Sequence, residues 1–332
     1  CRAAAAGSSR RASYRPSAGE CSQYRAQSKG GVVAGKIWEF FGYRSDDHSP
    51  AAVAAATDKQ CPYLSEVCEK RLSDGAIAGV CTIKPVTSGP VICCPIRLYA
   101  DKYRALYDVA KIAFEEDFEL VAGGKASARA KAKQAPVVAV FGKRWGGELR
   151  LPQKDGAGSY FVDWVLALLD ANGKLKEFVA VEVQTIDTTG NYRNGRESLL
   201  TPERTNPATT VGLNWENVNK RILPQLIYKG QVLQREALCR KGLFFICPHP
   251  VYTRIMARLG GVAGLIRYAL QPASITFLAY EHEETGIIDG ATVPLKALPP
   301  HSTTVYKVQE AFNNVTLPDE NVYKAAIEAA LG

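Results

Sequence analysis

Runs of apolar residues in the middle of the chain predict a block of β-strands. These runs are rich in β-branched and aromatic side chains, as buried strands are. Glycine, asparagine and lysine residues between them are typical of turns. The predicted strands cover residues 136–141, 147–151, 160–169, 178–186, 243–247 and 274–280, and a shorter apolar element covers 37–42.

Apolar residues at helical spacing predict helices before and after this block. In the helix at 217–234, Pro224 should produce a kink because proline removes a backbone donor. Along the chain, helices come first, a block of strands follows, and further helices and strands come last. This order predicts an α/β fold in which a mixed sheet is flanked by helices. The predicted helices cover residues 103–118, 123–134, 217–234, 250–259 and 319–331.

Two acidic residues interrupt the apolar strand runs. Asp163 lies within Phe-Val-Asp-Trp-Val-Leu, and Glu182 lies within Val-Ala-Val-Glu-Val-Gln. A carboxylate inside a buried strand costs several kcal/mol unless something compensates it. Gln184 shares a strand face with Glu182, and Glu148 is a third acid from the preceding segment. A divalent cation could compensate these acids, and so could a salt bridge to Arg144, Arg150 or another basic residue; the pattern alone leaves both open.

Four cysteines cluster in a segment with little periodicity. Cys61, Cys68, Cys81 and Cys94 are separated by six, twelve and twelve residues, a set that can form a tetrahedral sulfur site for zinc or iron. Cys93 makes the fourth ligand ambiguous. Buried free thiols are the alternative.

Composition adds a moderate basic charge and no membrane signal. The net charge is +8 over 332 residues, which fits a polyanion such as nucleic acid without requiring one. No apolar stretch is long enough to span a membrane, and the basic N-terminus lacks an apolar signal core, so we expect a cytoplasmic protein. Four parts are predicted: a basic, disordered arm at 1–30, a four-cysteine segment at 31–100, a core at 101–318 and a C-terminal helix at 319–332.

A set of motifs runs in order from about residue 36 to about residue 260. The first is 39–44, and a four-cysteine motif follows at 61–64, Cys68, 79–81 and 94–97. Further motifs, which contain the acids, are 146–149, 161–164, 181–185 and 190–192, and a helix follows at 212–214 and 217–221. In this order the motifs resemble those of the NotI family of type II restriction endonucleases.

The resemblance implies a restriction-endonuclease-like PD-(D/E)xK fold with an N-terminal four-cysteine metal-binding segment. It implies a homodimer that makes Mg²⁺-dependent double-strand cuts at GC-rich palindromic DNA. Whether a cognate DNA methyltransferase in the same system is a further partner is left open by the sequence. Carried over by position, Asp163, Glu182 and Gln184 would be catalytic and Glu148 an auxiliary acid. Cys61, Cys68, Cys81 and Cys94 would hold structural iron; the residues alone do not separate iron from zinc.

The resulting hypothesis is hydrolysis of a phosphodiester to leave a 5′-phosphate. Asp163, Glu182 and the Val183 carbonyl would hold Mg²⁺, and Gln184, at a position where related nucleases often carry lysine, would orient water without contributing charge. Guanine edges would be read by polar side chains of the stretch 185–207, for which the candidates are Arg193, Asn194, Arg196 and Arg204. The alternatives are a catalytically inactive DNA-binding protein and a nuclease of another DNA substrate.

Overall fold

The computed structural model describes residues 35–149, 161–261, 264–314 and 319–331. The arm predicted at 1–30 lies outside these residues. Within the described ranges, no helix is long and apolar enough to cross a membrane.

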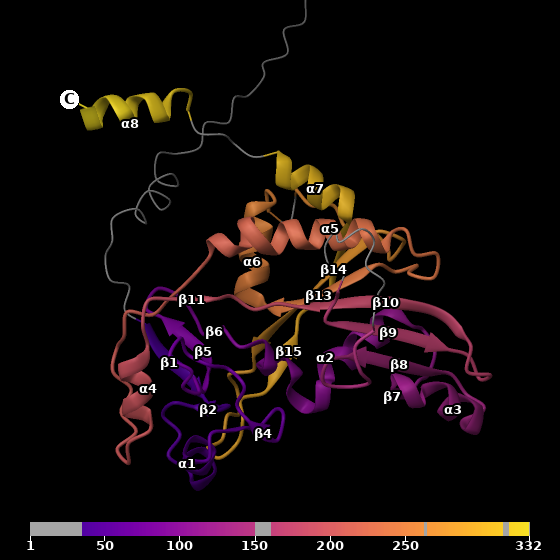
Figure 1. Ribbon diagram of the computed structural model, residues 1–332, viewed down its shortest axis with the longest axis horizontal. Helices are drawn as coiled ribbons and strands as arrows, with labels where there is room; N and C mark the ends of the chain where they lie inside the picture. Colours follow the sequence, from indigo (N-terminus) through magenta and orange to yellow (C-terminus); the bar gives the residue numbers. More distant parts are fainter. Residues whose placement is uncertain (1–34, 150–160, 262–263, 315–318, 332) are drawn as a thin grey trace, which may run out of the picture. The chain divides into compact units, whose positions relative to one another are not determined.

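A mixed sheet forms the centre of the described chain (Figure 1). Its strands are β7 (Leu120–Ala122), β8 (Val137–Gly142), β9 (Trp164–Leu169), β10 (Leu175–Val183), β13 (Leu243–Pro248), β14 (Ser274–His282), β15 (Leu295–Ala297) and β16 (His301–Thr304). Their order is β15-β14-β13-β10-β9-β8-β7, and β16 also pairs with β14. β9 is antiparallel to β8 and β10, whereas β10, β13 and β14 are parallel.

Helices cover both faces of this sheet, because alternate residues of its central strands are apolar on both sides. On one face, Val179, Val181 and Phe244 pack with α2 (Ala100–Ala113). On the other, Ala180 and Phe245 pack with π-helix η2 (Val218–Ile222), α5 (Leu223–Leu233), α6 (His249–Arg258) and α7 (Val305–Asn313). Figure 1 shows α5, α6 and α7 gathered on one side of the sheet and α2 on the other. α3 (Gly123–Lys133) packs on β8 through two buried alanines. The predicted mixed sheet flanked by helices is confirmed.

The cysteine segment contains a second, smaller sheet. Its order is β2 (Tyr43–Arg44), β1 (Gly35–Phe40), β5 (Val80–Pro85) and β6 (Val91–Ile92). Around it lie α1 (Pro50–Thr57), the short pair β3 (Gln60–Cys61) and β4 (Glu66–Val67), and the 3-10 helix η1 (Pro95–Tyr99). The short element predicted at 37–42 is therefore β1, but its partner β5 was not predicted.

Several predicted boundaries are corrected. The strand predicted at 147–151 is absent at 147–149, and its remainder lies outside the described residues. The helix predicted at 103–118 ends at Ala113, and the C-terminal helix is α8 (Val322–Leu331). Near Pro224, where a kink was predicted, the π-helical turn of η2 is followed directly by α5, which begins at Leu223. The polar stretch 185–207 contains β11 (Thr188–Thr189), which pairs with β12 (Gly212–Leu213), and α4 (Arg193–Leu199).

Candidate active site

The pairing of β9 with β10 brings Asp163 and Glu182 together. The antiparallel register ends at Val181 opposite Trp164, and its continuation places Asp163 opposite Glu182. The Val183 backbone N–H donates to Asp163 Oδ2 at 2.8 Å, which fixes this carboxylate against β10. Two carboxylates from neighbouring strands therefore share one end of the strand pair, as predicted from their positions in the sequence.

The two acids have different surroundings. Asp163 is exposed and precedes β9, whereas Glu182 is only 7% exposed. Loss of water around the carboxyl groups raises the pKa of both, and it raises that of Glu182 to about 7 with a further contribution from the negative charge of Asp163. Solvent reaches one side of Asp163, but the protein atoms around its carboxylate exclude enough water to raise its pKa. The pair is therefore unfavourable as two free carboxylates.

Lys229 is the cation that the structure places beside this pair. Its Nζ donates to Glu182 Oε1 at 2.6 Å, and the side chains of Lys229 and Glu182 are 16% and 10% exposed. Neither Arg144 nor Arg150 takes this place: Arg144 pairs with Glu69, and Arg150 lies outside the described residues.

Lys229 was not predicted as a site residue, although the sequence contains a signal for it. The apolar positions of the helix predicted at 217–234 include Leu226 and Leu233. Position 229 continues their spacing of three and four, so the lysine occupies the stripe that faces the sheet.

The donors at this site fit a divalent cation. Glu182 Oε2 is buried and has no hydrogen-bond partner among the described residues. A buried carboxylate oxygen without a partner is costly, and Mg²⁺ takes oxygen ligands from one or two carboxylates while it keeps several waters. The Asp163–Glu182 pair has the chemistry of such a site.

Gln184 and Glu148 lie at the margins of the site. Gln184 follows the end of β10; its backbone N–H donates to the Ile246 carbonyl at 3.0 Å and its side-chain Nε2 to the Thr185 carbonyl at 3.2 Å. Glu148 is exposed and lines a cavity of about 450 Å³ that Lys229 also lines. The predicted auxiliary acid therefore shares a cavity with the lysine that contacts Glu182.

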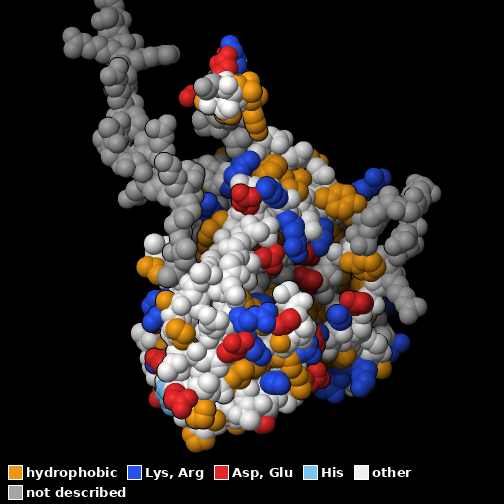
Figure 2. Space-filling view, turned by 60° about the vertical axis from the view of Figure 1, so that its left-hand side comes forward, with side chains coloured by type: hydrophobic (Ala, Val, Ile, Leu, Met, Phe, Trp, Pro, Cys, Tyr) orange, Lys and Arg blue, Asp and Glu red, His pale blue; other side chains and the backbone are white. Residues whose placement is uncertain are grey.

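The four candidate DNA-reading residues differ in accessibility. Arg196 and Arg204 are 8% and 5% exposed, and Arg196 Nε donates to the Ile77 carbonyl at 2.8 Å. Arg193 is half-buried and pairs with Asp74, and Asn194 is exposed. Because a base-reading side chain must reach a groove, Arg193 and Asn194 are the better-placed candidates in this conformation. Figure 2 shows acidic side chains recessed in a hollow of one face, with Lys and Arg side chains around it.

The four predicted cysteine ligands line one small cavity. It measures about 10 Å³, about the size of one water molecule, and Cys61, Cys68, Cys81 and Cys94 all contribute to its wall whereas Cys93 does not. Cys93 Sγ instead contacts the Cys81 carbonyl at 3.5 Å, and Lys70 Nζ donates to the Cys93 carbonyl at 2.9 Å. All five are free, buried thiols. In the described part of the chain, however, no three Cys, His, Asp or Glu side chains are arranged as a metal site, so the four-cysteine centre stays a prediction.

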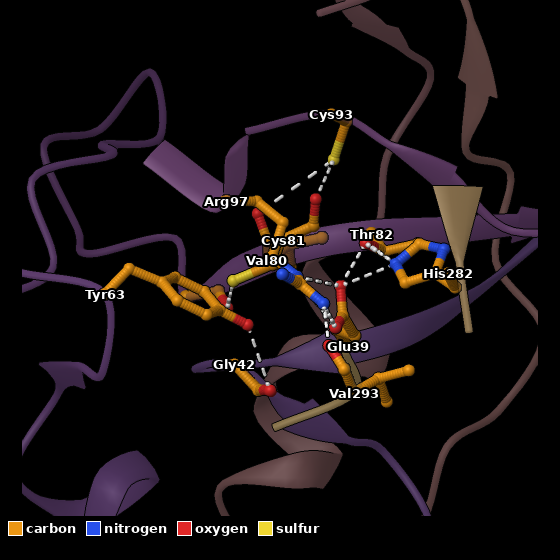
Figure 3. Close-up of polar contacts among 11 residues, drawn as sticks. Glu39, Gly42, Tyr63, Val80, Cys81, Thr82, Cys93, Arg97, His282 and Val293 are labelled. Atoms are coloured by element: carbon orange, nitrogen blue, oxygen red, sulfur yellow. Dashed lines mark hydrogen bonds and ion pairs between the residues drawn. The ribbon is translucent and has the colours of Figure 1, made fainter. Parts of the chain in front are cut away.

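A buried ion pair holds this segment against the large sheet (Figure 3). Arg97, from η1, pairs with Glu39 of β1 at 2.9 Å, and neither side chain is exposed. Glu39 also contacts Thr82 of β5 and, at 3.2 Å, His282 Nε2 at the end of β14, while Arg97 donates to the Val293 carbonyl. Figure 3 shows Arg97, Thr82 and His282 converging on Glu39, beside Cys81 and Tyr63.

One comparison with known proteins identifies a family for this chain. A family model described as "Restriction endonuclease NotI" matches residues 43–241, more than half of the chain. The matched region contains Glu148, Asp163, Glu182, Gln184, Lys229 and the four cysteines. No curated protein matches the sequence.

Proposed function

Because the chain belongs to the NotI family of restriction endonucleases, we propose that it is a type II enzyme that makes Mg²⁺-dependent double-strand cuts in DNA. Its fold, a mixed sheet with helices on both faces, fits such a nuclease. The finer parts of the proposal are a GC-rich palindromic site, a homodimer to match the symmetry of that site, and products with 5′-phosphates. A cognate methyltransferase stays a prediction.

The observation that carries the proposal is the paired carboxylates at the end of β9 and β10. Asp163 and Glu182, with the Val183 carbonyl, would hold Mg²⁺, and the unpaired Glu182 Oε2 supports this. When bound, Mg²⁺ offsets the charge of the phosphate and lowers the pKa of a bound water. Gln184 would orient water through its amide, and Glu148 would hold a second water or ion.

The reaction is a hydrolysis and needs no other co-reactant. The oxygen of water bonds to phosphorus and the bond from phosphorus to the 3′ oxygen breaks. One proton of the water leaves to solvent and the 3′ oxygen takes up another, which gives a 5′-phosphate and a 3′-hydroxyl.

Plasmid cleavage tests the proposal. Wild-type protein with Mg²⁺ should cut a sequenced GC-rich plasmid into discrete bands, and Asp163→Asn should give none because it removes a carboxylate of the pair. Mapping the ends then gives the recognition site and stagger. Absence of cleavage of any DNA with several divalent metals would refute the enzymatic proposal and leave a DNA-binding protein. Cleavage of single-stranded or structured DNA alone would identify a different nuclease.

The iron centre is a separate proposal. Its support is the cavity that Cys61, Cys68, Cys81 and Cys94 line together. Metal analysis of protein purified without oxygen distinguishes iron from zinc.

A further inference from the structure

The position after Glu182 that related nucleases use for a lysine holds a neutral glutamine here. Gln184 Nε2 donates to the adjacent Thr185 carbonyl, and an amide supplies no net charge. A positive charge at this site therefore has to come from another element.

Helix α5 supplies a lysine beside Glu182, where Gln184 contributes no charge. Lys229 Nζ lies 2.6 Å from Glu182 Oε1, and both side chains are largely buried. Among the ion pairs of the described residues, Lys229 is the single basic partner of Glu182, and Glu182 is the single acidic partner of Lys229. The contact is therefore specific to the carboxylate pair.

The packing of α5 fixes the direction of this lysine. Leu223 and Leu226 are buried against the sheet, on the same helix stripe as Lys229. At Gly230 a Cβ atom would lie 2.9 Å from Val305 Cγ2, so the missing side chain lets α7 approach α5 closely. Held between sheet and α7, the helix cannot turn Lys229 away from Glu182 without losing this packing.

We propose that Lys229 is a positioning residue of the active site, which supplies from α5 the positive charge that position 184 lacks and fixes the Glu182 carboxylate. This inference rests on the proposed nuclease function. A merely structural ion pair would stabilise the fold but would not make the rate of cutting depend on charge at this point.

Moving the lysine tests this proposal. Lys229→Met and Lys229→Gln remove the charge, and Lys229→Met combined with Gln184→Lys returns it at the residue that follows β10. Single-turnover cutting should fall about 100-fold in both neutral variants, the size of effect seen when one preorganised charged or donor group is removed. The double variant with the relocated lysine should cut at least about tenfold faster than Lys229→Met alone.

Two further measurements separate positioning from folding. DNA affinity without metal should stay within about threefold of wild type, because only the cutting step depends on the charge. Ca²⁺ should raise the melting temperature of Lys229→Met at least as much as that of wild type, because removal of a cation leaves the carboxylates free to bind the ion.

Lys241→Met is the matched control. Lys241 forms a similarly buried pair with Glu177, 3.2 Å away, near the opposite end of β10. The Lys241→Met variant should have a lower melting temperature than wild type. Its cutting rate should stay within about threefold of wild type, since the broken ion pair is far from Asp163 and Glu182.

The possible failures are distinct. A wild-type protein that cuts no DNA refutes the proposed function and this inference with it. A wild-type protein that cuts, with Lys229→Met or Lys229→Gln cutting equally fast, refutes the inference alone. So does a relocated lysine that recovers nothing, or a Ca²⁺ response lost together with Lys229.

Discussion

At the scale of the residue, the decisive feature is Glu182, a nearly buried carboxylate with a second carboxylate beside it. Loss of water and the negative charge of Asp163 raise its pKa, Lys229 partly opposes them, and the net pKa is about 7. Since the folded-state pKa lies above the ordinary value of 4.5, the metal-free fold is destabilised as pH rises through the window from 4.5 to about 7. A divalent ion at the pair would reverse that loss.

The first prediction concerns this pair and metal removal. Added Mg²⁺ or Ca²⁺ should raise the melting temperature of EDTA-treated protein more at pH 8 than at pH 6, because at pH 6 the ion must displace a proton from Glu182. Differential scanning fluorimetry at the two pH values measures this. Glu182→Gln should abolish the difference; an equal shift at both pH values in wild type would contradict the assignment of the ion to this pair.

At the scale of the element, the sequence predicted the catalytic strands but not every partner. β9 and β10 were recognisable because their runs are rich in β-branched and aromatic residues, and a short turn between them made Asp163 and Glu182 neighbours. β5, which pairs with β1, was missed because its apolar run is short and ends at Lys84 and Pro85. The strand predicted at 147–151 failed in its described part, where Gly147 has a φ of +81°, outside the extended conformation. The helical stripe placed Lys229 on the side of α5 that faces the sheet, but its contact with Glu182 depends on how α5 packs on β10, which no local pattern contains.

The second prediction concerns the cysteine segment. Cys94 lines the small cavity with the other three predicted ligands, while Cys93 is turned toward the backbone of β5. Cys94→Ser should therefore lose most bound metal, and Cys93→Ser should retain it. Elemental analysis of the two variants, purified identically without oxygen, gives the answer. Equal loss in both variants would contradict Cys94 as the ligand, and absence of metal in wild type would refute the centre itself.

At the scale of the whole molecule, the ion pair of Glu39 and Arg97 joins the cysteine segment to strand β14. Burial raises the pKa of Glu39, but Arg97, His282 and Thr82 outweigh it, and the net pKa is lowered. A lowered carboxyl pKa contributes stability that is present above about pH 4.5 and lost as the pH falls.

The third prediction follows from this burial. Arg97→Met leaves the Glu39 charge without its main partner in a fully buried place, which should cost about 3–5 kcal/mol of the free energy of unfolding. Adding Glu39→Gln should recover part of that loss, because the unpaired charge is then gone. Urea unfolding of the two variants beside wild type measures both effects. If Arg97→Met alone were as stable as wild type, the Glu39–Arg97 pair would contribute no stability.

The contact between Glu39 and His282 also bears on the order in which the protein is completed. The two residues are 243 positions apart in the chain. During synthesis β1 emerges well before β14, the strand whose His282 contacts the buried Glu39. Closing so long a loop slows folding, since its entropy is lost before the contact forms. The small sheet around β1 is therefore completed only after β14 has been synthesised, and a chain truncated before β14 lacks the His282 contact to Glu39.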